Sequence, residues 1–172
     1  METTKEERAW TSWLSAVLIG RHPKRTLGRI AVLVVTCVAV FNLLLPIRVE
    51  GISMLPTYRD QGVNFVNRMA YLFHRPRRGD VVAIEFAGRQ VMLMKRVIGL
   101  PGETISFHLG RAYINGQPLA EPYVKNGCNW EIEPRVIGPD EYYVVGDNRS
   151  MSESDHTKGI AVRRRIVGKV LL

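Results

Sequence analysis

Ser53 and Lys95 are the two residues of this chain whose types and surroundings best suit nucleophilic chemistry. Ser53 lies in the run GISMLPT (residues 51–57), a short apolar turn that Pro56 interrupts. A serine hydroxyl attacks a carbonyl only when a base takes its proton, and most serines in turns simply hydrogen-bond the local backbone. The run therefore predicts a candidate nucleophile that depends on a base elsewhere in the chain.

Lys95 is the candidate base. It stands in the apolar run VMLMKRVI (residues 91–98), and because strand side chains alternate, it shares a face with Leu93 while Arg96 points the other way. A lysine on an apolar face is either a gatekeeper at an exposed sheet edge or a desolvated amine, and composition by itself favours the gatekeeper. Desolvation would lower the pKa of the amine from about 10.4 towards neutrality, so that it could take the proton of Ser53 without a histidine.

An apolar segment just before Ser53 is a candidate membrane anchor. Residues 30–47 (IAVLVVTCVAVFNLLLPI) contain no charge, and about 18 residues at roughly 1.5 Å each approach the thickness of a bilayer core. The segment lacks the polar stripe of a buried helix and the small-residue site of a cleaved signal peptide, so an uncleaved anchor is favoured. Only about five residues separate Ile47 from Ser53, a reach under about 20 Å, which predicts a nucleophile close to the membrane surface.

Charge around this segment predicts its orientation. Basic residues crowd residues 21–29, whereas Arg48 stands alone after the span, so the N-terminus is expected in the cytoplasm of a single-pass protein of the inner or plasma membrane. The predicted divisions are a cytoplasmic or interfacial segment (1–29), the anchor (30–47) and an extracytoplasmic catalytic domain (48–172). Tryptophans at helical spacing near residues 10–18 predict an interfacial helix or, alternatively, a packed N-terminal helix.

Short apolar runs separated by glycine and proline follow the anchor, which predicts a mainly β fold of coiled or barrel-like antiparallel sheets. Asn115-Gly116 is a hairpin signal. One short helix is considered around residues 63–73. The expected strands span residues 81–86, 91–98, 104–107, 112–114, 141–145 and 165–170.

Composition excludes several classes of protein. The net charge of +8 is accompanied by no zinc-finger spacing, RNA-binding aromatic motif or long basic helix, so nucleic acid is not an expected partner. Membrane lipids are an expected partner, because anionic head groups suit clustered arginines. For the two clusters after the apolar segment, at residues 75–78 and 163–165, an ordinary solvated surface is an equal alternative. Cys37 and Cys128 lie in different environments, which argues against a disulfide, and the histidines lack ligand spacing. No metal and no cofactor are therefore expected.

Four motifs in this order resemble the boxes of type I signal peptidases (leader peptidases), a family of serine proteases with a Ser-Lys dyad. They are GISMLPT (51–57), RGDVV (78–82), KRVIGLPGE (95–103) and GDNRSMS (146–152). The resemblance covers residues 30 to 170 and implies that family's fold behind one N-terminal transmembrane helix. It also implies an enzyme that cleaves signal peptides from exported preproteins outside the cytoplasm.

The resemblance assigns roles to individual residues. Ser53 would be the nucleophile, with its backbone amide as an oxyanion donor, and Lys95 would be the general base. Ser152 falls on the serine that orients the lysine. Asp147 and Arg149 match a structural ion pair near the site, and they could equally form a tight turn that closes the fold.

Three departures limit this assignment. Gly51 stands where some members have a serine whose hydroxyl completes the oxyanion hole, so the second donor must be water or a backbone amide. The last box usually continues Ser-x-Asp-Ser-Arg, but here it continues through Glu153 and Ser154 to Asp155, whose role stays open. The interval between Lys95 and residue 146 leaves room only for a small β-insertion, about 104–140.

Substrate pockets and alternative functions complete the prediction. Val49, Met54 and Met94 are placed to line narrow apolar pockets for the small residues of a signal peptide, with plain core packing as the alternative. A dedicated maturation peptidase for a pilin-like substrate shares the same boxes. An inactive membrane-tethered binding subunit would not need both Ser53 and Lys95, and a soluble self-cleaving repressor would need a DNA-binding motif in place of the anchor.

Overall fold

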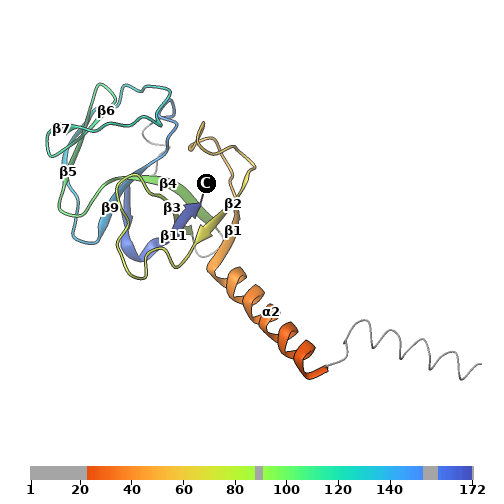
Figure 1. The fold of residues 1–172 in the computed structure, drawn as a ribbon. Coiled ribbons are helices and arrows are strands. Elements are labelled where there is room, and N and C mark those ends of the chain that lie inside the picture. The colour runs from red at the N-terminus through yellow and green to blue at the C-terminus, as the bar shows by residue number, and fades with distance from the viewer. Residues whose placement is uncertain (1–22, 88–90, 153–158, 172) are drawn as a thin grey trace, which may run out of the picture. The chain divides into compact units, whose positions relative to one another are not determined.

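The structure is a computed structural model that describes residues 23–87, 91–152 and 159–171 (Figure 1). The chain divides into two units, residues 1–42 and 43–172. The predicted interfacial segment at residues 10–18 and the position of Asp155 lie outside the described residues.

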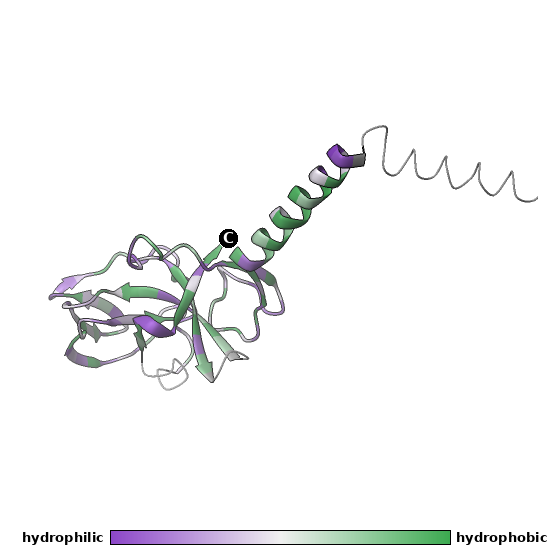
Figure 2. Cartoon of the chain, turned by 90° about the horizontal axis from the view of Figure 1, so that it is seen from below, coloured by the Kyte–Doolittle hydropathy of each residue, from purple (hydrophilic) through white to green (hydrophobic). Residues whose placement is uncertain are grey.

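The first unit contains the helix α2 (Pro23–Leu43), which is long and apolar enough to cross a membrane. Figure 2 shows hydrophobic residues along most of α2 and hydrophilic residues gathered towards its N-terminal end. Proline suits a first helical position because its missing N–H has no partner there. Asn42, the polar residue near the other end, donates from Nδ2 to the Val38 carbonyl at 2.7 Å, so its amide is bonded within the helix.

The helix begins earlier and ends earlier than the predicted span of residues 30–47. It stops at Leu43, and Leu44–Arg48 form the first strand instead. Pro46 explains this end, because a proline ring clashes with the carbonyl four residues before it. The same residue is tolerated in β1 because β1 is an edge strand.

The second unit is built from two antiparallel sheets. The larger has the strand order β1-β2-β11-β3-β4-β9-β10 and the smaller the order β7-β6-β5-β8. The strands are β1 (Leu44–Arg48), β2 (Val63–Asn67), β3 (Val81–Ala87), β4 (Val91–Gly99), β5 (Thr104–His108), β6 (Arg111–Ile114), β7 (Gln117–Pro118), β8 (Ile132–Val136), β9 (Glu141–Val145), β10 (Ile160–Val162) and β11 (Ile166–Leu171).

The mainly β prediction is confirmed, and the six predicted strands correspond to β3, β4, β5, β6, β9 and β11. The short helix considered around residues 63–73 is wrong. Residues 63–67 form β2, which pairs with both β1 and β11, and Val66 is buried while its neighbour Phe65 is exposed. This two-residue period is that of a strand, but five residues are too few for the sequence pattern alone to distinguish a strand from a helix.

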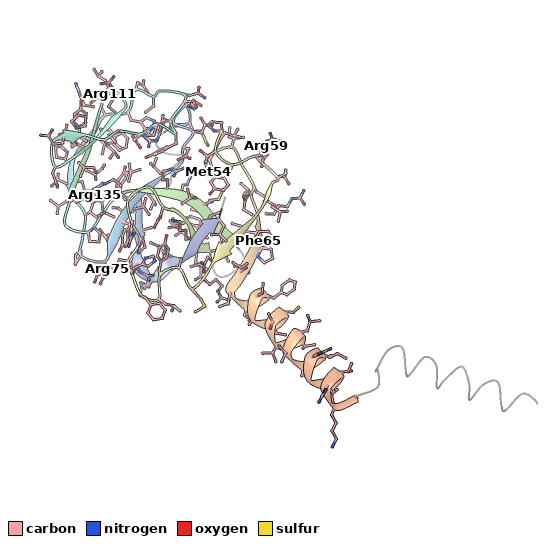
Figure 3. All side chains as sticks on the ribbon, viewed as in Figure 1. Met54, Arg59, Phe65, Arg75, Arg111 and Arg135 are labelled. Carbon is pink, nitrogen blue, oxygen red and sulfur yellow. The ribbon has the colours of Figure 1, made fainter. Side chains whose placement is uncertain are left out.

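Three apolar clusters hold the second unit together. The first packs Val49 and Met54, from the turn after β1, against Met94 of β4. Figure 3 shows Met54 among interior side chains, whereas Arg75 and Arg135 lie at the periphery. The second cluster lies around Val82, Val97 and Tyr142. The third joins the two sheets through Ile98, Ile105, Phe107 and Tyr143, so the small sheet, with strands between residues 104 and 136, shares a core with the large one.

Candidate active site

The turn that carries Ser53 connects β1 to β2 and depends on a glycine. Gly51 has φ +99°, a conformation that side chains disfavour, and its N–H donates to Asp60 Oδ1 at 2.8 Å. The Leu55 N–H closes the turn on the Ile52 carbonyl at 3.1 Å. Among the described residues, no group accepts a hydrogen bond from the N–H of Ser53, so this N–H is available to a ligand.

A second segment, residues 147–149, holds this turn from across the chain. The Asn148 N–H donates to the Ser53 carbonyl at 3.0 Å, and its Nδ2 donates to the Ile52 carbonyl at 3.1 Å. Thr57 Oγ1 donates to Asp147 Oδ2 at 2.5 Å. The backbone of the nucleophile turn is therefore held by hydrogen bonds between two sequence motifs that are almost one hundred residues apart.

Asp147 is in turn held by Arg96 of β4. The guanidinium donates through Nε to Oδ1 at 2.7 Å and through Nη2 to Oδ2 at 2.6 Å, a two-point geometry that suits arginine and carboxylate. Arg96 also donates to the Gly79 carbonyl at 2.7 Å and lies 4.1 Å from the ring centroid of Tyr123. Burial lowers the pKa of Arg96, but hydrogen bonding to Asp147 and its charge outweigh this and raise the pKa overall.

The predicted ion pair between Asp147 and Arg149 is wrong in its partners. Arg149, only 1% exposed, pairs with Glu121 through both terminal nitrogens, and its Nε donates to the Gly146 carbonyl at 3.1 Å. Residues two apart in a turn direct their side chains differently, and each charge finds a partner from a distant segment. The tight-turn alternative holds for Asn148, whose Oδ1 accepts from Ser150 Oγ at 2.6 Å.

Lys95 is a buried lysine in the middle of the large sheet. Its side chain is 4% exposed, and β4 lies between β3 and β9, so the gatekeeper interpretation is wrong because β4 is not an edge strand. Across the described residues, no side chain hydrogen-bonds its amine and no carboxylate pairs with it. Burial lowers the pKa of Lys95 to about 8, because the low-dielectric surroundings disfavour the ammonium.

Ser53 and Lys95 line neighbouring cavities. A cavity of about 590 Å³ is bordered by Ser53 and by all three predicted pocket residues. A second cavity, of about 370 Å³, is bordered by Lys95. Leu93 lines both. Val49, Met54 and Met94 also belong to the first apolar cluster, so they pack in the core and border the cavity at once. Their contact with a substrate stays a prediction.

Ser152 lies elsewhere. It is exposed and lines an open cavity of about 740 Å³ with Cys128 and Trp130. Ser152 is followed directly by residues outside the described part, so its role in orienting the Lys95 amine stays a prediction.

Sequence reasoning missed three residues that shape the site: Thr57, Arg96 and Asn148. Each lies inside a motif that had been recognised, so its position was visible, but its partner was not. The part of the chain with described coordinates holds no group of three or more His, Cys, Asp and Glu side chains that could bind a metal ion.

The chain is similar to known proteins of one family. The family model for signal peptidase, peptidase S26, matches residues 24–172. A signal peptidase I from Bacillus amyloliquefaciens is 38% identical over 134 residues, 72% of this chain and 69% of that protein. Another from the same organism is 31% identical over 97% of this chain and 89% of its own length.

Two further matches are more partial. A signal peptidase I from Leptolyngbya laminosa is 36% identical over 70% of this chain, and the match spans 63% of that relative's length. A solved structure of a signal peptidase I from Enterococcus faecalis resembles the chain with a TM-score of 0.47 at 26% identity, covering 56% of this chain and 97% of that one.

Proposed function

The chain belongs to the signal peptidase family (peptidase S26), and from this premise we propose that it is a membrane-anchored serine endopeptidase that removes signal peptides from exported preproteins. Ser53 is the nucleophile and Lys95 the general base. The observation that carries the assignment is Lys95: an interior-strand amine, 4% exposed, whose pKa burial lowers to about 8. Burying an amine without a partner lowers the folding stability of the protein. A role as a general base near neutral pH would explain why the buried lysine is present despite this cost.

The reaction follows acyl transfer. Lys95 Nζ, in its neutral form, takes the proton of Ser53 Oγ while the oxygen attacks the carbonyl carbon of the scissile bond. The resulting ammonium returns the proton to the departing amine, and the C–N bond breaks to leave an acyl ester on Ser53. Lys95 then deprotonates a water molecule, which hydrolyses the ester and regenerates the serine.

The negative oxygen of the intermediate needs hydrogen-bond donors. The N–H of Ser53 suits this role because none of the described groups accepts its hydrogen bond. The N–H of Gly51 is less suitable, since it donates to Asp60 Oδ1 at 2.8 Å. Gly51 has no side chain, so we assign the second donor to a water molecule.

The cavity beside Ser53 suits an extended peptide with small apolar residues before the cut. Val49, Met54 and Met94 narrow it with side chains that belong to the core and therefore cannot move aside easily. Pairing along the free edge of β1 would hold such a peptide by its backbone. Ser152 is retained as a candidate for orienting the amine, a role that requires a contact with Lys95 on substrate binding.

The helix α2 is the proposed anchor, with the N-terminus in the cytoplasm and the catalytic unit on the extracytoplasmic side. Lys24, Arg25 and Arg29 near its N-terminal end support this orientation by the positive-inside rule. Tethering would keep the catalytic unit at the surface where signal peptides emerge and so raise its local concentration.

The test is cleavage of a preprotein with an Ala-x-Ala site by the full chain in detergent. Ser53→Ala and Lys95→Met are each expected to lower the cleavage rate by at least about a thousandfold. Ser106→Ala and Lys125→Met, in the small sheet and its loop, are the matched controls and should cleave normally. Undiminished cleavage by either dyad variant overturns the assignment. Cleavage of one pilin-like substrate alone would identify a dedicated peptidase.

A further inference from the structure

The loop between β2 and β3 has a composition unlike the rest of the second unit. Residues 68–78 (RMAYLFHRPRR), here called the arginine loop, contain four arginines and no acidic residue. They also contain large apolar side chains at the positions between the arginines. This mixture of cationic and apolar side chains is typical of segments that lie at a membrane surface.

Apolar side chains of the arginine loop are turned outward. Phe73 is 93% exposed, Leu72 61% and Met69 41%. An exposed phenylalanine next to an exposed leucine is unfavourable in water, and adjacent exposed apolar side chains mark a contact site.

The loop is held in this shape from inside. Tyr71 is buried, its hydroxyl donates to Asp80 Oδ2 at 3.1 Å, and its carbonyl accepts from Arg163 Nη2 at 3.0 Å. The Leu72 N–H donates to the Met69 carbonyl at 3.1 Å. Because Tyr71 is fixed inward, the two residues after it are presented outward by a formed turn.

The charges of the loop are open to a ligand of opposite sign. Arg68, Arg75 and Arg77 are exposed, and no carboxylate in the described ranges forms an ion pair with them. Figure 3 shows Arg75 at the periphery of the unit. Arg78 differs, because its guanidinium pairs with Glu103 at 2.5 Å and so already has a partner within the protein.

Strand register places the loop beside the point where the chain leaves the helix. Leu44 of β1 lies opposite Asn67 of β2, and the Arg68 N–H donates to the Leu43 carbonyl at 3.0 Å. Leu43 is the last residue of α2. Phe73 follows Arg68 by five residues, so it lies within about 17 Å of this point even if the loop is extended.

We infer that the arginine loop binds the surface of an anionic lipid bilayer, with Leu72 and Phe73 entering the interfacial region and Arg68, Arg75 and Arg77 meeting lipid phosphates. This inference rests on the proposed role of α2 as a membrane span. A second copy of the same loop is a poor partner, because the like charges would repel. Binding at this point would add a second attachment beside the helix end and restrict tilting of the catalytic unit over the bilayer.

The test places a fluorescent probe at single cysteines of the full chain reconstituted in vesicles that contain one-quarter phosphatidylglycerol in phosphatidylcholine. In a Cys37→Ala, Cys128→Ala background, Phe73→Cys carries the probe in the loop. Leu109→Cys, at a position 72% exposed in the turn between β5 and β6, is the matched control. The native Cys37 in a Cys128→Ala chain reports on α2 itself. Quenchers attached to lipids at shallow and deep positions measure contact with the bilayer.

The probe at position 73 is expected to be quenched by the shallow quencher several-fold more than the probe at position 109. Arg75→Gln together with Arg77→Gln should weaken this contact about 25-fold, from roughly fivefold per arginine, while cleavage of a soluble peptide stays unchanged. Equal, weak quenching at positions 73 and 109 with strong deep quenching at Cys37 overturns the inference and leaves the span intact. Absence of quenching at Cys37 overturns the span, and the inference with it. Equal quenching at position 73 in pure phosphatidylcholine overturns the assignment of an anionic lipid.

Discussion

Lys95 and Arg96 are neighbours on strand β4, and the structure treats their charges in opposite ways. Arg96 faces Asp147 at 2.6 and 2.7 Å, and its pKa is raised overall. Lys95 is 4% exposed, and burial lowers its pKa to about 8. The two faces of one strand therefore separate a paired charge from a buried amine that has no paired carboxylate among the described residues.

This comparison shows what makes a buried cation structural. The Arg96 pair ties β4 to the segment that holds the Ser53 turn, because Asp147 also accepts a hydrogen bond from Thr57 at 2.5 Å. Within the described residues, the Lys95 amine forms no hydrogen bond or ion pair that would offset the free-energy cost of its burial. A group that costs stability without binding a partner is a candidate for chemistry.

Removing the ion pair between Arg96 and Asp147 should have the largest effect on stability. Asp147→Asn leaves the buried Arg96 charge unmatched, and the free energy of unfolding should fall by about 3–5 kcal/mol. Thermal unfolding of the full chain in detergent, followed by tryptophan fluorescence, measures the change. Glu131→Gln, at an exposed pair with His108, is the control and should unfold like the parent. A stable Asp147→Asn protein would show that the pair does not hold the Ser53 turn.

Removing the charge of Lys95, on the other face of β4, should stabilise the protein. The pKa of Lys95 is about 8 when folded and 10.5 as its ordinary value, a difference that corresponds to about 3 kcal/mol. The unfolded chain binds more protons between these values, so this contribution to stability rises with pH through that window and is lowest below pH 8. Lys95→Met should therefore raise the free energy of unfolding at pH 7 by about 2–3 kcal/mol. Lys125→Met, on the surface, should change nothing, and a destabilised Lys95→Met would contradict the assigned cost.

The pH dependence of the cleavage rate should distinguish the role of Lys95 from that of Arg96. Only the neutral amine is a base, so cleavage should rise about tenfold per pH unit below the pKa and level off above about pH 8. Arg96→Lys is expected to lower the rate without moving this midpoint, since Arg96 does not take part in proton transfer. A rate that rises only near the ordinary lysine pKa of 10.5 would contradict burial of Lys95 in the working enzyme.

The smallest effect is expected at Gly51, in the turn that the paired face supports. Its φ of +99° is unfavourable for alanine although no atom lies within 4 Å of an added Cβ. Gly51→Ala should therefore lower the free energy of unfolding by about 1 kcal/mol through backbone strain alone. Gly127→Ala is the matched control, since its surroundings are equally open and its φ is not in the left-handed region. Equal stabilities would show that the turn relaxes.

Sequence patterns predicted features that depend on neighbouring residues. The uncharged run predicted an apolar helix, although Pro46 moved its end to Leu43. Alternation along residues 91–98 predicted β4 and put Lys95 and Arg96 on opposite faces. The missed strands β1, β2, β8 and β10 are short, and they form because a partner strand offers hydrogen bonds, which no local pattern reveals.

The sequence by itself determined the residue types, their order in four motifs and the local periods that produce helix and strand. The tertiary structure decided which charges meet and which remain alone. Asp147 pairs with Arg96, 51 residues away, and Arg149 pairs with Glu121, 28 residues away, rather than with each other. Such pairings depend on how distant strands lie side by side, and so does the burial that lowers the pKa of Lys95 to about 8.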